Sequence, residues 1–128
     1  MRYTLEIPPV TIGKRIFHTR RLPPDLNARM HYMVRAGWSK AFREHAFLFA
    51  RAAKIPAHDK AVVTIENHAI RLKDGDNLIT TLKPILDGLR DAKVIPDDDH
   101  GHVRVASEQV RVHHKKDEKV FIHIEAYE

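Results

Sequence analysis

The order of hydrophobic patterns along this 128-residue chain is the feature that most limits its fold. Residues 2–7 alternate between polar and apolar side chains, which is typical of a strand with one buried face. Residues 14–20 are a weaker candidate strand. Residues 39–54 instead place apolar side chains at helical spacing, with Ser39 as the predicted N-cap and Pro56 just beyond the end. Strand patterns therefore give way to a helix pattern, and the same change occurs again further along.

The second half of the chain repeats this order. Residues 60–72 are rich in β-branched side chains and predict a strand, and residues 77–92 predict a helix. Two final strands are predicted at 103–113 and 119–127, and a change of apolar phase in the first of them indicates a bulge or break. No repeat or linker divides the chain. The order predicts one α/β domain over residues 1–128, in which a mixed β-sheet packs with two main helices.

Composition excludes several classes of protein. The chain has no cysteine, which rules out disulfides and thiolate zinc sites and fits a reducing compartment. Its ten histidines include no His-Glu-x-x-His spacing, which argues against a zinc enzyme. Neither a signal peptide nor a transmembrane span is recognisable. We therefore expect a cytoplasmic protein with no membrane partner.

The net charge of +5 is distributed unevenly. Residues 11–56 contain ten Lys/Arg against two acidic residues, whereas residues 71–100 contain seven aspartates against five Lys/Arg. A basic half suits a polyanion such as DNA, and an acidic cluster inside a basic protein attracts a cation. An ordinary solvated basic surface would produce the same asymmetry. The candidate DNA-contacting residues are Arg20, Arg21, Asn27, Arg29, Arg35, Lys40, Arg43 and Lys73.

Asp74 and Asp76 flank Gly75 where the predicted strand meets the second predicted helix. Two carboxylates two residues apart in a turn can bind one hard cation, such as Mg²⁺. The pair also fits a structural role in which Asp76 caps the helix. A calcium loop of the EF-hand type is excluded, because Leu78 and Ile85 occupy the fifth and twelfth ligand positions.

One face of the second predicted helix carries Asp76, Thr80, Lys83 and Asp87, opposite a leucine-rich stripe. A carboxylate, an ammonium and a second carboxylate would therefore project together. A Lys83–Asp87 pair at i, i+4 on a solvated face would explain the same pattern without any catalytic role. Pro84 should kink this helix or mark its true first turn.

A second acidic group, Asp97-Asp98-Asp99, follows the helix. Adjacent carboxylates repel one another, so they suit a cation site better than a structural role, although simple surface exposure would also accommodate them. Acidic clusters that hold Mg²⁺ against a phosphodiester are the usual arrangement in nucleases. The basic first half would then supply contacts to the polyanion that is cut.

These segments together resemble the core signature of the RusA family of Holliday junction resolvases. The matching segments are Asp74-Gly75-Asp76-Asn77, Lys83-Pro84-Ile85-Leu86-Asp87-Gly88-Leu89 and Val94-Ile95-Pro96-Asp97-Asp98. An earlier segment, Leu22-Pro23-Pro24-Asp25-Leu26-Asn27, is similar to the family's Pro-Pro-x-x-Asn element. The resemblance covers residues 22–103. The seven-residue gap from Asp76 to Lys83 is longer than in the best-known member.

The resemblance implies a homodimeric endodeoxyribonuclease that depends on Mg²⁺ or Mn²⁺ and resolves four-way DNA junctions by paired symmetric nicks, in DNA recombination and repair. Members of the family are often carried by phages. The family's site residues correspond here to Asp74, Asp76, Lys83 and Asp98, with Asp97 or Asp99 as alternates for Asp98. By the same resemblance, the three aspartates would bind the metal and the lysine would be catalytic.

Paired nicks require two active sites, so a chain with one acidic site is expected to act as a two-fold dimer. The strands predicted at 103–113 and 119–127 are candidate sheet edges that could pair or pack across its interface. Two alternatives stay open: a non-catalytic DNA-binding protein on the same fold, and a nuclease that prefers flaps or replication forks. Trp38 is expected to be packed in the protein rather than stacked on a DNA base.

Overall fold

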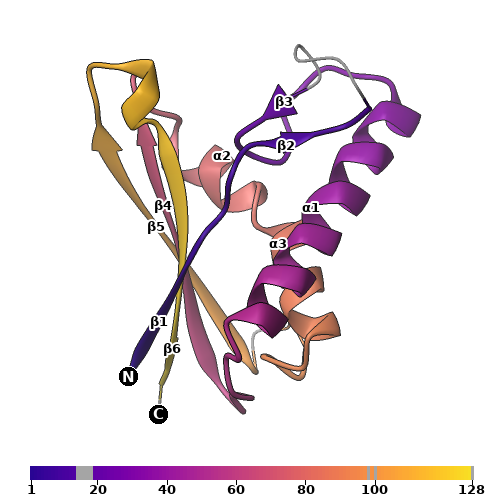
Figure 1. The fold of residues 1–128 in the computed structure, drawn as a ribbon, viewed down its shortest axis with the longest axis vertical. Helices are drawn as coiled ribbons and strands as arrows, with labels where there is room; N and C mark the ends of the chain where they lie inside the picture. Colours follow the sequence, from indigo (N-terminus) through magenta and orange to yellow (C-terminus); the bar gives the residue numbers. More distant parts are fainter. Residues whose placement is uncertain (14–18, 98, 100, 128) are drawn as a thin grey trace.

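A mixed four-stranded sheet with its α-helices on one side forms the body of the protein (Figure 1). The computed structural model describes residues 1–13, 19–97, 99 and 101–127. The strands lie in the order β1-β6-β4-β5, with β4 and β5 parallel and the other neighbours antiparallel. Their bounds are Arg2–Glu6 for β1, Ala61–Ala69 for β4, Val103–Arg111 for β5 and Lys119–Ala126 for β6. The predicted α/β fold class, a mixed sheet with two main helices, is confirmed.

The remaining elements cover the sheet or close its end. The two main helices are α1 (Tyr32–Ala52) and α3 (Lys83–Asp91), and α2 (Gly75–Thr80) is a short helix between β4 and α3. A separate ribbon pairs β2 (Val10–Thr11) with β3 (Thr19–Arg20), and a 3₁₀ turn, η2 (Lys115–Asp117), precedes β6. No helix within the described residues is long and apolar enough to cross a membrane.

The core lies between the helices and one face of the sheet. Alternate residues of the central strands are buried there: Val63 and Ile65 of β4 lie opposite Ile124 and Ile122 of β6. Strand alternation places these side chains on one face, and burying each of them contributes about 1.5 to 3 kcal/mol. This packing holds the sheet against α1 and α3. It therefore also fixes the position of the connection between the end of β4 and the start of α2.

Gly88 explains how closely the two main helices approach each other. A Cβ atom at this position would lie 2.4 Å from the Arg43 carbonyl oxygen and 2.7 Å from the Ala46 Cβ. Contacts that short do not occur between real atoms, so a side chain here would push α1 and α3 apart. The glycine within the Lys-x-x-x-Asp-Gly-Leu segment therefore has a packing role.

The first main helix begins earlier than its sequence pattern predicted. The expected N-cap at Ser39 is wrong, because α1 starts at Tyr32 and His31 caps it, accepting a hydrogen bond from the Met33 amide at 3.2 Å. The added turns are held by Trp38, which is buried against Phe42 with ring centroids 6.3 Å apart. Trp38 is thus packed in the protein, as expected.

The helix predicted over residues 77–92 is divided into two. α2 ends at Thr80 and α3 begins at Lys83, with Pro84 in its first turn. Proline lacks an N–H and fits the first turn, where that donor has no helical acceptor. The second of the two roles expected for Pro84, marking a true first turn, is confirmed.

Two details of the predicted sheet are wrong. β5 pairs with β4 in unbroken register from Val103 to Arg111, so the expected bulge is absent from this strand. β5 is an outer strand, so apolar side chains can be partly exposed on either of its faces. Val105 and Val110 lie on opposite faces and are both partly exposed, which produces the change in the apolar alternation without a bulge. The other expected edge, β6, lies between β1 and β4.

Candidate functional site

Asp74 and Asp76 lie at the junction between β4 and α2. Asp74 is the N-cap of α2, and its Oδ1 accepts a hydrogen bond from the Asp76 amide at 2.9 Å. The capping role considered for Asp76 therefore belongs to Asp74. Both residues are exposed, and within the described residues the Asp76 carboxylate accepts no hydrogen bond. The Asp76 oxygens and the second Asp74 oxygen remain available to a cation.

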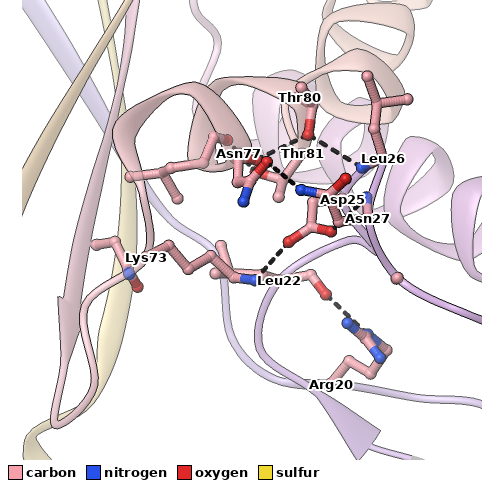
Figure 2. A network of polar contacts seen from close by, with 12 residues as sticks. Arg20, Leu22, Asp25, Leu26, Asn27, Lys73, Asn77, Thr80 and Thr81 are labelled. Atoms are coloured by element: carbon pink, nitrogen blue, oxygen red, sulfur yellow. Dashed lines mark hydrogen bonds and ion pairs between the residues drawn. The ribbon is translucent and has the colours of Figure 1, made fainter.

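The early proline-rich loop docks against α2, the helix that Asp74 caps (Figure 2). Asn27 donates its side-chain amide to the Asn77 Oδ1 at 2.7 Å. The Leu26 amide donates to the Thr80 Oγ1 at 3.2 Å, and that hydroxyl donates to the Asn77 carbonyl at 2.7 Å. Two sequence motifs fifty residues apart are thus joined by side-chain hydrogen bonds. Thr80, predicted on the charged helix face, instead holds the loop.

An ion pair anchors the same loop from the other side. The Lys73 ammonium lies 2.7 Å from the Asp25 Oδ2 (Figure 2), and Asp25 is 7% exposed. The hydrogen bond from Lys73 is the main reason that the pKa of Asp25 is lowered, and the lysine charge adds to it against the opposing effect of burial. Arg35 donates to the Asp25 carbonyl at 2.9 Å. The loop is therefore held through both the side chain and the backbone carbonyl of Asp25.

A chain of amide contacts continues from Lys73 into the sheet. The Gln109 side chain accepts from the Lys73 amide at 2.9 Å and donates to the Lys73 carbonyl at 2.6 Å. Asn67, fully buried on β4, donates to the Gln109 oxygen at 3.4 Å and accepts from the Arg21 guanidinium. Buried amides need such partners. The connection that carries Asp74 and Asp76 is thereby tied to two strands.

Charged side chains form a continuous run along α3. Lys83 lies 3.3 Å from the Asp87 Oδ1, Arg90 lies 3.6 Å from the same oxygen, and Arg90 also lies 3.8 Å from Asp97. The Asp87 Oδ1 is buried and accepts no hydrogen bond from the described residues, so Lys83 and Arg90 attract it by their charge. The i, i+4 pair expected for Lys83 and Asp87 is present. The run leads from the start of α3 to the acidic segment before β5.

The third predicted metal ligand, Asp98, lies outside the described residues. Of its neighbours, Asp97 faces Arg90, and the Asp99 Oδ1 accepts from the Gly101 amide at 3.0 Å. Within the described ranges, no group of three or more His, Asp or Glu side chains lies close enough to hold a metal ion. Asp74 and Asp76 are the described part of the predicted metal site, and their oxygen donors fit a hard cation.

Several residues predicted to contact DNA make contacts inside the protein. Arg35 donates to two loop carbonyls. Arg43 forms a bidentate ion pair with Asp91, at 2.6 and 2.9 Å, and this pair links α1 to α3. Arg20 donates to the Leu22 carbonyl (Figure 2) and lies over the Trp38 ring. Their DNA-binding role stays a prediction. The exposed members of the predicted set are Asn27, Arg29 and Lys40.

A polar cluster that the sequence interpretation missed lies on the sheet face away from the helices. Glu66 contacts the His68 Nε2 at 2.6 Å and the His123 Nε2 at 3.2 Å, and the His123 Nδ1 contacts the Thr4 hydroxyl at 2.8 Å. The hydrogen bond with His68 is the main cause of a lowered Glu66 pKa. The Glu-x-His spacing on a predicted strand was the available signal, since residues i and i+2 share a face.

No protein-family model matches the chain, and no curated protein matches it. The connection between β4 and α3 provides two exposed carboxylates, Asp74 and Asp76, and is followed by a helix that starts with Lys83.

Proposed function

We propose that this chain is a Mg²⁺-dependent endodeoxyribonuclease that resolves four-way DNA junctions by paired symmetric nicks, with Mn²⁺ as a substitute cation. The observation that carries the proposal is the 2.7 Å hydrogen bond from Asn27 to Asn77. It joins the Pro-Pro-x-x-Asn element to the Asp-x-Asp-Asn segment, so both motifs of the resemblance contribute to one surface beside Asp74 and Asp76. A chance match to either motif alone would not predict this contact.

Asp74 and Asp76 would hold the cation, with Asp98 as the third ligand and Asp97 or Asp99 as its alternates. Carboxylate oxygens are the ligands that Mg²⁺ prefers, and the Asp76 carboxylate accepts no hydrogen bond within the described part of the chain. When bound, the ion would supply Lewis-acid stabilisation of the phosphate charge and a lowered pKa for the attacking water.

The protein's own residues would orient the reaction. In hydrolysis the water oxygen bonds to phosphorus, the P–O3′ bond breaks, and the proton balance leaves a 3′-hydroxyl and a 5′-phosphate. Lys83 would offset the negative charge that grows on the phosphate. Asp87, 3.3 Å from its ammonium, would keep that charge on the outer face of α3. The Asp25–Lys73 pair would hold the carboxylate-bearing connection in place.

A direct assay tests the proposal. A synthetic four-way junction and a linear duplex of the same sequence would be incubated with the protein in Mg²⁺, in Mn²⁺ and in EDTA. We expect paired nicks in the junction with either metal, none in EDTA, and little cutting of the duplex. Equal cutting of both DNAs would contradict junction resolution, and preferential cutting of flap or fork substrates would indicate the related nuclease activity instead.

One observation favours a second candidate, a DNA-binding protein without catalysis. Asp74 caps α2, which is the structural role that an aspartate would keep if the metal site were lost. Junction binding with no strand cleavage in either Mg²⁺ or Mn²⁺ would support this candidate over the nuclease.

The proposal includes a homodimer, because two opposed nicks need two sites. β5 is an outer strand of the sheet, and its Val105 and Val110 are 40% and 44% exposed, so this edge can pair or pack with a second copy. Light scattering at micromolar concentration, with and without junction DNA, should give about twice the 14.8 kDa chain mass. A particle near 14.8 kDa in both conditions would contradict the paired-nick mechanism.

A further inference from the structure

A basic groove lies apart from Asp74 and Asp76, on the β1 and β6 side of the sheet. It encloses about 310 Å³ between the Pro8–Pro9 segment, Arg21 and the η2 turn. Its charged lining consists of Arg21, Lys115, Lys116, Lys119, Glu6 and Glu118. Four cations against two carboxylates leave the groove positive.

The two carboxylates neutralise only part of this charge. Lys119 lies 3.9 Å from Glu6, and both side chains are about half exposed, so solvent weakens the pair. Glu118 lies 3.9 Å from Arg21 and also accepts from the Ile70 amide at 3.1 Å. Lys115 and Lys116 are exposed and make no ion pair within the described residues. Their ammonium groups are therefore available to an external anion.

Arg21 gives the groove a fixed donor. Its guanidinium is anchored by Asn67, a fully buried residue of β4, and its side chain is 22% exposed. Burial lowers the pKa of Arg21 and outweighs the opposing effect of Glu118, so the charge is not fully compensated within the protein. A planar guanidinium that is already ordered loses little conformational freedom when it binds a phosphate.

The groove and the carboxylates lie toward the same end of the sheet. The amide contacts from Arg21 through Asn67 and Gln109 to Lys73 connect them physically. β6 is the neighbour of β4 in the order β1-β6-β4-β5, so the groove at the start of β6 and the connection that follows β4 leave the sheet from adjacent strands. A DNA arm that lies across this end of the sheet can therefore contact both places.

We propose that this groove binds the phosphate backbone of a DNA arm that flanks the cut site, with Lys115 and Lys116 as contacts and Arg21 as the anchored donor. The inference rests on the proposed function, since it assigns a second contact to the same substrate. The ligand is a phosphodiester chain without sequence readout, because ammonium and guanidinium groups position a backbone and carry no base code.

The test compares two double variants of equal charge. Lys115→Ala/Lys116→Ala removes two groove lysines, and Arg2→Ala/Lys60→Ala removes two exposed cations from the opposite end of the sheet. Binding of a fluorescein-labelled four-way junction would be followed by anisotropy in EDTA, between about 50 and 200 mM NaCl. Circular dichroism would check that both variants fold, and Lys115→Arg/Lys116→Arg would restore the charge.

We expect the groove variant to bind about tenfold more weakly, with the slope of log K against log salt reduced by about 1 to 2. The control variant should stay within about twofold of the parent protein. Equal losses of junction affinity in the two variants would overturn the groove assignment. Cleavage of the junction by the parent protein would, in that case, still support the proposed nuclease function. If the parent protein binds the junction without cleaving it in Mg²⁺, the proposed function fails, and a selective loss in the groove variant still supports this site. Failure of the parent protein to bind DNA would overturn both.

Discussion

Asp25 and Asp76 are the same residue type in opposite environments. Asp25 is 7% exposed and bonded to Lys73 at 2.7 Å, which lowers its pKa. Asp76 is exposed, and its carboxylate accepts no hydrogen bond within the described residues. A buried, paired carboxylate is costly to disrupt, whereas an exposed one contributes little to stability. Asp76 thus keeps its oxygens for a ligand, and Asp25 uses its oxygens to hold the loop beside it.

This difference predicts two kinds of variant. Changes at the exposed carboxylates should remove activity and leave the free energy of unfolding unchanged. Changes at Asp25 should lower the free energy of unfolding while leaving the cation ligands intact. Measuring both quantities on each variant tests whether the two roles are separate.

The largest effect is expected at the proposed cation ligands. Asp74→Asn, Asp76→Asn and Asp98→Asn should each lower junction cleavage by about 1,000-fold, because an amide is a weaker Mg²⁺ ligand than a carboxylate. Junction binding should be equal or tighter, since each change removes a negative charge near phosphate. Asn also serves as an N-cap, so even the Asp74 variant should stay within about 0.5 kcal/mol of the parent stability.

Asp59→Asn is the matched control, because Asp59 is exposed and precedes β4 at the other end of that strand. It should cleave at the parent rate. Near-normal turnover in any one of the three site variants, purified and folded, would remove that residue from the proposed site.

A smaller loss of activity is expected from Lys83→Ala. If the ammonium acts on the transition state, the single-turnover rate should fall about 100-fold while junction affinity changes by less than about threefold. Lys83→Arg should recover part of the rate by keeping the charge. Gel-shift titration beside single-turnover kinetics separates the two quantities. Equal losses of rate and affinity would make Lys83 a phosphate contact instead.

Much of the fold could be predicted from sequence because its elements are strongly periodic. The strands at β1, β4, β5 and β6 follow alternating or β-branched runs, and tertiary packing then selected their order. The Ser39 capping signal does not locate the start of α1, because the extra turns depend on the packing of Trp38 in the core. The bulge expected in β5 was wrong because exposure at an outer strand produced the same change of phase.

The candidate site was less predictable, because its supporting contacts join distant residues. Charge alone predicts DNA contacts for Lys73 and Arg35, but in the structure they bond to Asp25 and to loop carbonyls, which only the tertiary structure identifies. Adjacent lysines at 115 and 116 were visible in the sequence. Their proximity to Arg21 was not, since Arg21 and Lys115 are 94 positions apart in the sequence.

The third prediction concerns Asp25 and the free energy of unfolding. Asp25→Asn should lower the free energy of unfolding by about 2 kcal/mol at pH 7, because it leaves the Lys73 ammonium partly buried without its anionic partner. The pKa of Asp25 is lowered in the folded protein, so its contribution is complete above the unfolded value of about 4 and is lost as the pH falls through the folded value.

Urea unfolding of the parent and Asp25→Asn proteins at pH 7 and near pH 3 should therefore give curves that converge in acid. Lys73→Met in the same background measures the pair directly by a double-mutant cycle. A stability gap that stays constant between the two pH values would show that the ion pair is not the source of the effect.

The smallest effect is expected at Glu66, which resembles Asp25 in its lowered pKa but has histidine partners. Neutral imidazoles can donate to both oxygens of this carboxylate. In Glu66→Gln one imidazole keeps an acceptor oxygen, and the other can change tautomer to accept from the new amide. The variant should therefore lose only about 0.5 kcal/mol at pH 7, and cleavage should be unaffected because the cluster lies on the sheet face away from the helices.

The pKa of Glu66 is lowered in the folded protein, so its carboxylate contributes fully to stability above the unfolded pKa of about 4.3. The difference in the free energy of unfolding between the parent protein and Glu66→Gln should therefore shrink as the pH falls below that value. Urea unfolding at pH 7 and near pH 3 measures that gap. A gap that widens in acid would contradict this account and would assign the stabilisation to the charged imidazoles rather than to the carboxylate.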